Sequence, residues 1–193
     1  MGFFRHLSNF LGLGRRNVDI IVVGLDNSGK TTILNQLKPP ESRLTTIVPT
    51  MGYTVTNFTS ENFNFNAFDM AGQSKYRSVW ETYYGAAQAV IFVVDSSDKL
   101  RMAVARDELW MIFDHKDVSN RQLPILIFAN KSDLPDSVSA AEMTQILGLD
   151  VVRGHQWHII SCCALSNSNS NGLEDGMRWI GERLKERLES AAK

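Results

Sequence analysis

From residue 18 onward, short apolar runs alternate with longer segments in which apolar residues recur every three or four positions. This alternation predicts strand–helix–strand units and therefore an α/β fold. The apolar runs are Val18 to Val23, Ala89 to Val94, Leu123 to Ala129 and His158 to Ser161. Because most of these runs are nearly continuously apolar, we expect them to be buried strands of a mostly parallel sheet with helices on both faces.

Two further segments complete the predicted fold. Between residues 62 and 67, asparagines alternate with apolar residues, and a β-rich run from Tyr53 to Phe58 precedes them. This alternation predicts a hairpin with one wetter face. At the end of the chain, apolar residues at helical spacing from Leu173 to Leu188 predict a helix that packs against the sheet.

The composition indicates one folded domain. Of the 193 residues, 44% are hydrophobic and 21% are charged, so the chain can bury a core without a disulfide or a metal. The formal net charge of -1 gives no electrostatic basis for nucleic-acid binding. The only cysteines, Cys162 and Cys163, are neighbours, which excludes a disulfide framework and favours a reducing compartment. No run reaches about 18 apolar residues, so we expect no membrane-spanning helix and a cytoplasmic, monomeric protein.

A phosphate-binding pattern, GxxxxGK[ST], is present in the run Gly24-Leu25-Asp26-Asn27-Ser28-Gly29-Lys30-Thr31. A predicted strand precedes this run and a predicted helix from Thr32 to Lys38 follows it, which is the context that the pattern requires. The glycines allow backbone N–H groups to surround phosphate oxygens. Lys30 brings positive charge to the β- and γ-phosphates, and Thr31 offers a hydroxyl ligand to Mg²⁺. The alternative is a glycine turn with an incidental lysine.

A second motif predicts which nucleotide binds. Asn130-Lys131-Ser132-Asp133 directly follows the apolar run that ends at Ala129. Asp133 accepts hydrogen bonds only, which suits the ring N–H and amine of guanine, whereas adenine presents an acceptor there. We therefore expect GTP and GDP as ligands, with the backbone N–H of Ala164 donating to the guanine oxygen. Standing alone, the same four residues are also typical of a surface turn.

A third motif, Phe68-Asp69-Met70-Ala71-Gly72-Gln73, ends the predicted hairpin. We expect Asp69 to hold Mg²⁺ through water, Gly72 to donate its N–H to the γ-phosphate, and Gln73 to orient the attacking water as the catalytic residue. Thr50 lies in a stretch from 39 to 52 that we expect to be flexible, and we expect this residue to be a ligand of the same Mg²⁺. The predicted metal ligands are therefore Thr31, Thr50 and Asp69.

In this order, the motifs resemble those of the Arf and Arf-like small GTPases over nearly the whole chain. The runs from Asp69 to Arg77 and from Asp95 to Met102 are most similar to the sixth Arf-like subfamily, whose members work at cilia with the Bardet-Biedl syndrome coat complex. The resemblance implies a P-loop small-GTPase fold with a six-stranded sheet, one antiparallel edge strand, and switch regions at about 39 to 55 and 69 to 84. It also implies an exchange factor, a GTPase-activating protein, and recruitment of a coat or effector complex to membranes at the cilium or its base.

Some residues differ from the family pattern. Ala71 stands where many Arfs have glycine, which adds a methyl group to the second switch. Tyr53, Trp80 and Tyr83 match the aromatic effector patch, but Phe68 stands where Arfs usually have tryptophan. The alternative is that these aromatics belong to the core near the hairpin.

We expect an N-terminal arm over residues 1–16 and a GTPase domain over residues 17–193. Apolar residues of the arm lie on one predicted helical face: Phe3, Phe4, Leu7, Phe10 and Leu11. This pattern favours a helix that binds a membrane surface. The alternative is an apolar arm folded onto the protein, and the two can alternate with the nucleotide state. His6 occupies the position where N-myristoylation at Gly2 requires serine or threonine.

The surroundings of the site predict slow hydrolysis by the isolated chain. Heterotrimeric G-protein α subunits carry an arginine three residues before the switch threonine, but this chain has Ile47 there. The nearest basic residue, Arg43, lies in a stretch expected to be flexible, and the Asp26 carboxylate opposes the charge that develops on the γ-phosphate. We expect a rate on the order of 10⁻⁴ s⁻¹ or below, and an activating protein that supplies an arginine.

Other function classes stay open at this stage. A module that holds GTP permanently is the alternative to a GTPase that times a signal, and Gln73 favours the GTPase. An ATP-dependent kinase or ATPase is a third class, which Asp133 opposes. A regulator of non-ciliary vesicle traffic is the alternative to a ciliary role.

Overall fold

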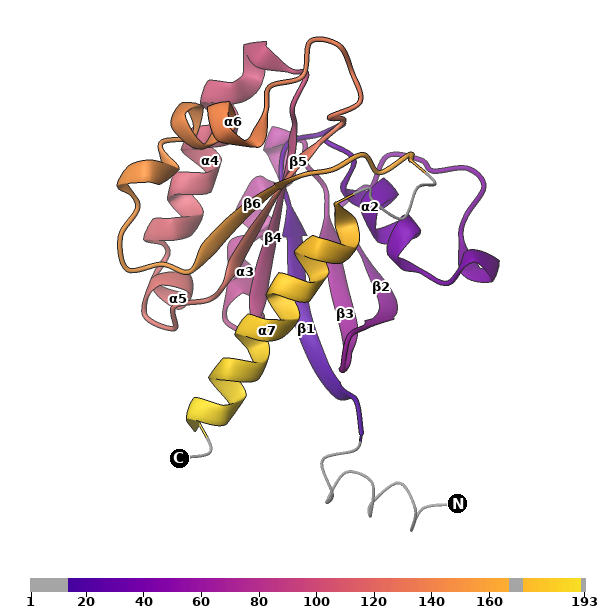
Figure 1. The fold of residues 1–193 in the computed structure, drawn as a ribbon, viewed down its shortest axis with the longest axis vertical. Helices are drawn as coiled ribbons and strands as arrows, with labels where there is room; N and C mark the ends of the chain where they lie inside the picture. The colour runs from indigo at the N-terminus through magenta and orange to yellow at the C-terminus, as the bar shows by residue number, and fades with distance from the viewer. Residues whose placement is uncertain (1–13, 167–171, 192–193) are drawn as a thin grey trace.

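A six-stranded sheet forms the centre of the structure, a computed structural model that describes residues 14–166 and 172–191 (Figure 1). The strands are β1 (Arg16–Val23), β2 (Tyr53–Ser60), β3 (Phe63–Met70), β4 (Ala89–Asp95), β5 (Ile125–Asn130) and β6 (Trp157–Ser161). Their order across the sheet is β2-β3-β1-β4-β5-β6. Every neighbouring pair is parallel except β2 and β3, which confirms the predicted mixed sheet with one antiparallel edge.

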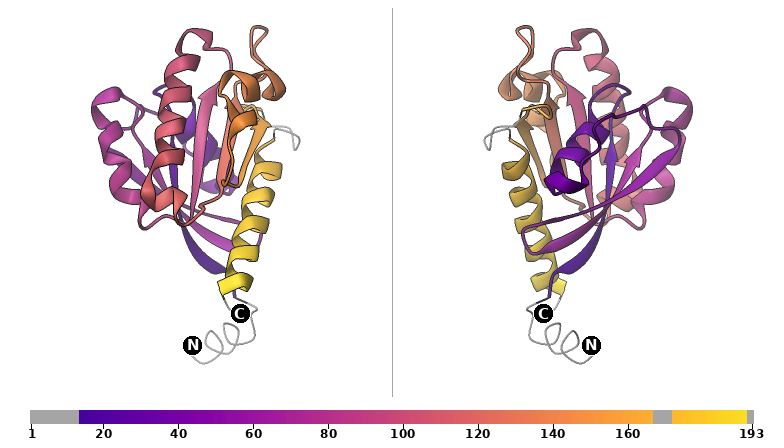
Figure 2. Two further views of the ribbon diagram at one scale, coloured as in Figure 1. Left: turned by 90° about the vertical axis from the view of Figure 1, so that its left-hand side faces the viewer. Right: turned by 90° about the vertical axis from the view of Figure 1, so that its right-hand side faces the viewer.

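Helices cover both faces of this sheet. They are α2 (Lys30–Leu37), α3 (Glu81–Tyr84), α4 (Met102–Asp114), α5 (Lys116–Ser119), α6 (Ala140–Ile146) and α7 (Leu173–Ala191). Short 3₁₀ turns are η1 (Pro40–Ser42), η2 (Ser74–Val79), η3 (Lys99–Arg101) and η4 (Leu149–Val151). α2 and α7 cover one face, and α3, α4 and α6 cover the other (Figure 2). Within the described residues, no helix is long and apolar enough to cross a membrane.

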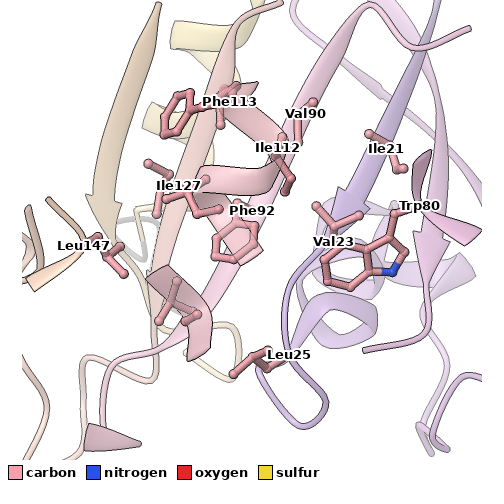
Figure 3. Close-up of a cluster of buried hydrophobic side chains, with 14 of the residues drawn as sticks. Ile21, Val23, Leu25, Trp80, Val90, Phe92, Ile112, Phe113, Ile127 and Leu147 are labelled. Atoms are coloured by element: carbon pink, nitrogen blue, oxygen red, sulfur yellow. The ribbon is translucent and has the colours of Figure 1, made fainter. Parts of the chain in front are cut away.

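The core explains the continuous apolar runs. Successive residues of β1 point to opposite faces, so Ile21 packs with α3 and α4 while Ile20 packs with α2 and α7. All residues of β4 and β5 are buried, because both faces of these central strands are covered. In Figure 3, Phe92 and Ile127 from the strands lie near Ile112 of α4. Burial of each large side chain contributes roughly 1.5–3 kcal/mol.

The hairpin at the sheet edge has the two faces that the alternation predicted. Phe63, Phe65 and Ala67 of β3 are buried against the α2 and α7 side. On the other face, Asn64 donates to Asn17 Oδ1 at 3.0 Å, and Asn66 donates to Asp19 Oδ1 at 2.7 Å. Asn64 and Asn66 of β3 are thus satisfied by side chains of β1, its parallel neighbour.

The topology brings the sequence motifs together. β1, β3, β4, β5 and β6 run in one direction, so the residues that follow each of them lie at the same edge of the sheet. Ligand sites of open parallel sheets form at this edge. The proposed arm over residues 1–16 falls almost entirely outside the described residues.

Candidate nucleotide site

The phosphate loop, residues 24–31, curves around the carboxyl end of β1 as its glycines predicted. Gly24 has φ 137° and Gly29 has φ 97°, values that side chains rarely allow. A Cβ atom at Gly24 would lie 2.2 Å from the Val93 carbonyl oxygen, and one at Gly29 would lie 2.2 Å from Asn130 Nδ2. The backbone therefore passes so close to β4 and to Asn130 that only glycine fits at these two positions.

Lys30 lies across the inside of this loop. Its Nζ donates to the carbonyl oxygens of Gly24 at 2.9 Å and Leu25 at 2.8 Å, and the residue is only 6% exposed. Burial lowers the pKa of Lys30 to about 8. An ammonium group has three N–H donors, so one remains for an anion in the loop.

Three oxygen-bearing side chains from separate segments meet beside Lys30. The Thr31 hydroxyl donates to Asp69 Oδ2 at 2.6 Å, and the Thr50 hydroxyl lies 3.0 Å from that of Thr31 and 3.3 Å from Asp69 Oδ2. Asp69 has 0% exposure, and burial raises the pKa of its carboxyl. Its Oδ1 has no hydrogen-bond partner among the described residues.

This cluster fits a magnesium ion. Two hydroxyls and one carboxylate are the hard oxygen ligands that Mg²⁺ takes, and it uses few of them beside phosphate oxygens. The unpaired Asp69 Oδ1 also lacks the compensation that a buried charge requires. The three predicted metal ligands, Thr31, Thr50 and Asp69, are therefore brought together by the fold.

The segment after β3 closes the site against the phosphate loop. Gly72 and Gln73 line a cavity of about 380 Å³ together with Lys30, Thr31 and Thr50. Ala71 connects the segment to its surroundings, because its N–H donates to the Gly52 carbonyl at 2.9 Å and its carbonyl accepts from Trp80 Nε1 at 3.1 Å. Gln73 is exposed on the wall of the cavity, where a side-chain amide can reach a water molecule.

Asp26 has a partner that the sequence did not indicate. Arg101, which ends η3, donates from Nη1 to Asp26 Oδ1 at 3.0 Å and from Nη2 to the Asp26 carbonyl at 3.2 Å. The Asp26 carboxylate, which we expected to oppose the charge that develops on the γ-phosphate, is therefore partly offset by a guanidinium. The two residues are 75 positions apart, and no local pattern connects them.

Arg43 lies away from the site. Its guanidinium donates to the carbonyl oxygens of Gln36 at 2.8 Å and Lys38 at 3.1 Å, at the end of α2. These bonds cap the last turn of the helix, where carbonyl groups lack partners. Arg43 is thereby occupied in the described structure and does not face the cavity that Gln73 lines.

Asn130 connects the phosphate loop to the segment after β6. It is 2% exposed, its Nδ2 donates to the Ser28 carbonyl at 2.8 Å, and its Oδ1 accepts from the Ala164 N–H at 3.0 Å. The Ala164 N–H that we expected to face guanine is thus donated to Asn130 here. For Ala164 to bind guanine, its N–H would have to be shared between Asn130 Oδ1 and the guanine oxygen. The assignment of Ala164 to the base therefore stays a prediction.

The other residues of the second motif follow the carboxyl end of β5. Lys131 has φ 63°, and its Nζ lies 2.6 Å from Asp95 Oδ2, which orients the lysine along the end of β4. Asp133 is exposed. Burial, followed by the hydrogen bond to Asp133, raises the pKa of the Cys163 thiol. Asp133 is thus solvent-accessible, and its assignment to the guanine base stays a prediction.

Three of the four predicted effector aromatics form a surface cluster. The ring of Tyr83 lies 5.1 Å from that of Tyr53 and 5.2 Å from that of Phe68, measured between centroids. Trp80 is 2% exposed and belongs to the core, so the expectation of a surface role for it is wrong. Its indole N–H requires the Ala71 carbonyl as a partner inside the protein.

Comparison with known proteins identifies relatives along the whole chain. The model of the ADP-ribosylation factor family matches residues 4–184. ADP-ribosylation factor-like protein 6 of Caenorhabditis briggsae is 53% identical to this chain over 190 residues, and the match covers 98% of each chain. The protein of the same name from Danio rerio is 45% identical over 185 residues, and the match covers 96% of this chain and 98% of the relative. Among solved structures, the Arl6 BBS3 small GTPase of Trypanosoma brucei with bound GppNp is similar, with a TM-score of 0.79, 39% identity, and coverage of 89% of this chain and 99% of that one.

Proposed function

Because this chain belongs to the ADP-ribosylation factor family and is therefore a GTP hydrolase, we propose that it is a switch that recruits a partner complex to a membrane only while it holds GTP. One observation carries the switching part of this proposal. Thr50, from the segment between η1 and β2, reaches both Thr31 of the phosphate loop and Asp69 of β3. This segment is otherwise mostly exposed, so its position depends on what occupies the site.

The same segment displays apolar side chains. Val48 is 70% exposed, Met51 is 76% exposed, and both lie within two residues of Thr50 in the chain. Val55 of β2 and the cluster of Tyr53, Phe68 and Tyr83 extend this surface. Exposed apolar surface of this extent is typical of a protein–protein interface. Contact between Thr50 and the γ-phosphate side of the site therefore connects the nucleotide to the partner surface.

The residues of the site account for binding and hydrolysis. A bound Mg²⁺ would neutralise charge on the β- and γ-phosphate oxygens, and Thr31, Thr50 and Asp69 are the residues that would hold it. Lys30 and the backbone N–H groups of the phosphate loop bind the phosphates. Gln73 orients the attacking water.

Hydrolysis by the isolated chain is slow in this proposal. Arg43 is bonded to the end of α2, and Arg101 is bonded to Asp26 and Asp98, so neither is free to stabilise the transition state. An activating protein that supplies an arginine meets this need. A measured unassisted rate near 10⁻² s⁻¹, the value of GTPases that carry this arginine in cis, would contradict the proposal.

We assign the guanine base to Asp133 and Lys131, next to the loop that contains Ala164. Family membership and the GppNp bound to the Trypanosoma brucei relative support a guanine nucleotide over ATP. Competition between GTP and ATP for the purified chain tests the assignment, because a buried polar mismatch discriminates by about 10⁴-fold. Competition by ATP within tenfold of GTP would contradict it.

The relatives also support a ciliary role. The similar proteins of Caenorhabditis briggsae and Danio rerio are named ADP-ribosylation factor-like protein 6, and the Trypanosoma brucei structure carries the name BBS3. We assign this chain the same setting: a cytoplasmic protein that binds membranes at the cilium or its base when GTP-loaded, and that recruits a coat complex of the Bardet-Biedl syndrome type. An exchange factor and an activating protein set its state.

Recovery of partners from a ciliated-cell extract tests this role. The purified chain is loaded with GppNp or GDP, and bound proteins are identified. We expect the coat complex with GppNp only, and neither state of the Thr31→Asn variant should recover it, because asparagine replaces a predicted Mg²⁺ ligand. Equal recovery in both states would favour a permanently loaded module, and recovery of a different vesicle coat would favour the non-ciliary alternative.

A further inference from the structure

The guanidinium group of Arg101 connects the phosphate loop to η3, the turn directly before α4. Arg101 makes two bonds to Asp26, at 3.0 and 3.2 Å, and its Nε lies 2.5 Å from Asp98 Oδ2. Asp98 is itself fixed, because it caps η3 by accepting from the Arg101 N–H. The guanidinium is therefore held by its own turn while it contacts the loop.

Asp26 is the only acidic residue of the phosphate loop, and it lies at the edge that faces the second switch. Its backbone nitrogen would be 2.3 Å from a Cβ atom on Gly72, the residue whose N–H we assign to the γ-phosphate. Asp26 also lines the cavity that contains Lys30, Thr31 and Thr50. Asp26 thus lies beside the residues that we assign to the γ-phosphate, by which GTP and GDP differ.

The charges of Asp26 and Arg101 both act on Lys30 of the phosphate loop. Burial is the main cause that lowers the pKa of Lys30, and Asp69 and Asp26 oppose it. Arg101 acts on Lys30 in the direction opposite to Asp26. The charges of Asp26 and Arg101 therefore both reach the phosphate-binding lysine, with contrary effects.

We propose that Arg101 is a positioning residue that favours GTP over GDP, by turning the Asp26 carboxylate away from the γ-phosphate and offsetting its charge. This inference rests on the proposed assignment of residues 24–31 to the phosphates. Without Arg101, the free carboxylate repels the additional negative charge of GTP more than it affects GDP. The expected effect is about fivefold, the size of one charge contact near a solvated surface.

If the bond between Arg101 and Asp26 has only a structural role, the variants should behave differently. If the bond only stiffens the loop, Arg101→Met removes it and Asp26→Asn weakens it, so both variants shift the ratio in the same direction. If charge at the γ-phosphate is decisive, Arg101→Met disfavours GTP whereas Asp26→Asn does not, because the asparagine carries no charge. The double variant then behaves like Asp26→Asn, so removal of the carboxylate rescues the loss of the arginine.

The test compares these three variants with the wild type in the full chain. Dissociation constants of GppNp and GDP are measured at low and high salt, and their ratio is the readout. Arg178→Met is the control, since it removes an arginine paired with Asp175 at 2.9 Å on α7, on the opposite face of the sheet. In this control variant, the ratio of the GppNp and GDP dissociation constants should equal that of the wild type.

We expect Arg101→Met to shift the ratio about fivefold towards GDP at low salt, less at high salt, and the double variant to restore it. An unchanged ratio in Arg101→Met, or a shift towards GDP in Asp26→Asn as well, would overturn the inference. Failure of the wild-type chain to bind either nucleotide would instead overturn the proposed function, so the two failures are distinguishable.

Discussion

Gly72 lies directly against Asp26. A Cβ atom on Gly72 would be 2.3 Å from the backbone nitrogen of Asp26 and 2.3 Å from the carbonyl carbon of Leu25. Distances below 3.0 Å to backbone atoms require one of the two segments to move. The absence of a side chain at residue 72 therefore allows the second switch to touch the phosphate loop in this arrangement.

Gly72→Ala should separate the two nucleotide states. The added methyl group forces the second switch off the phosphate loop, so we expect GppNp affinity to fall about tenfold or more while GDP affinity changes little. Titration with fluorescent analogues of both nucleotides measures this. Gly85→Ala is the control, because its Cβ atom would meet only Asp117 at an ordinary 3.7 Å. An equal loss for both nucleotides would contradict the expectation.

Asp69→Asn should weaken the dependence on magnesium while it stabilises the empty chain. The free Mg²⁺ concentration that slows nucleotide release should rise about 10- to 100-fold, since an amide is a poorer ligand than a carboxylate. Because burial raises the pKa of Asp69, its ionisation destabilises the nucleotide-free fold as pH rises above the unfolded value. The variant removes that buried charge, so its midpoint of thermal unfolding at neutral pH should increase without nucleotide. Asp107→Asn, at an exposed position of α4, should change neither property.

Nucleotide binding should take up a proton at alkaline pH. Lys30 has a pKa of about 8 in the described structure, and phosphate oxygens restore its charged form. Calorimetry with GDP in two buffers of different ionisation enthalpy should therefore show uptake of about half a proton at pH 8 and little at pH 6.5. Lys38→Met tests whether a nearby lysine at the end of α2 is responsible, and it should leave the uptake unchanged. No proton uptake at pH 8 would contradict the assignment of Lys30 to the phosphates.

Gln73→Leu and Thr31→Asn should act in opposite directions. Leucine cannot orient water, so hydrolysis stimulated by an activating protein should fall about 10²-fold and GTP should accumulate in cells. Asparagine at residue 31 should leave the chain deficient in GTP. The ratio of bound GTP to GDP after isolation from cells measures both. A wild-type ratio in the Gln73→Leu variant would favour a module that never hydrolyses its nucleotide.

The arm over residues 1–16 provides a membrane test in the full chain. Replacement of Phe4 and Leu7 by aspartate should abolish liposome binding of the GppNp-loaded protein and leave nucleotide affinity unchanged, because it removes the predicted apolar face. Replacement of Ser8 and Asn9 by aspartate adds the same charge to the other predicted face and should retain more binding. Equal flotation of both double variants with liposomes would contradict the assignment.

The local sequence pattern predicted which segments form strands and helices, but it located the ends of these segments only approximately. The predicted strand from Leu123 begins instead at Ile125, because Pro124 has no N–H to donate to the ladder. The first predicted helix ends at Leu37, since Lys38 precedes Pro39 and adopts extended backbone with ψ 155°. The hairpin was predictable because its side chains alternate between two faces with different surroundings.

Long-range contacts of the site were not predictable in the same way. The motifs indicated that Lys30, Thr31 and Asp69 meet, because their spacing has a chemical meaning in a nucleotide site. The bond between Arg101 and Asp26 has no such spacing, and it exists only because β1 and β4 are neighbours in the sheet. The burial of Trp80 likewise depends on tertiary packing that composition does not encode.

Asn130 has a consequence for the lifetime of the bound state. It is bonded at once to the loop around the phosphates, through Ser28, and to the loop beside the base, through Ala164. These two bonds couple the loops, so we expect a displacement of one loop to disturb the other. We therefore expect a regulator that displaces the phosphate loop to weaken the contact at Ala164 as well, and so to speed release of the whole nucleotide.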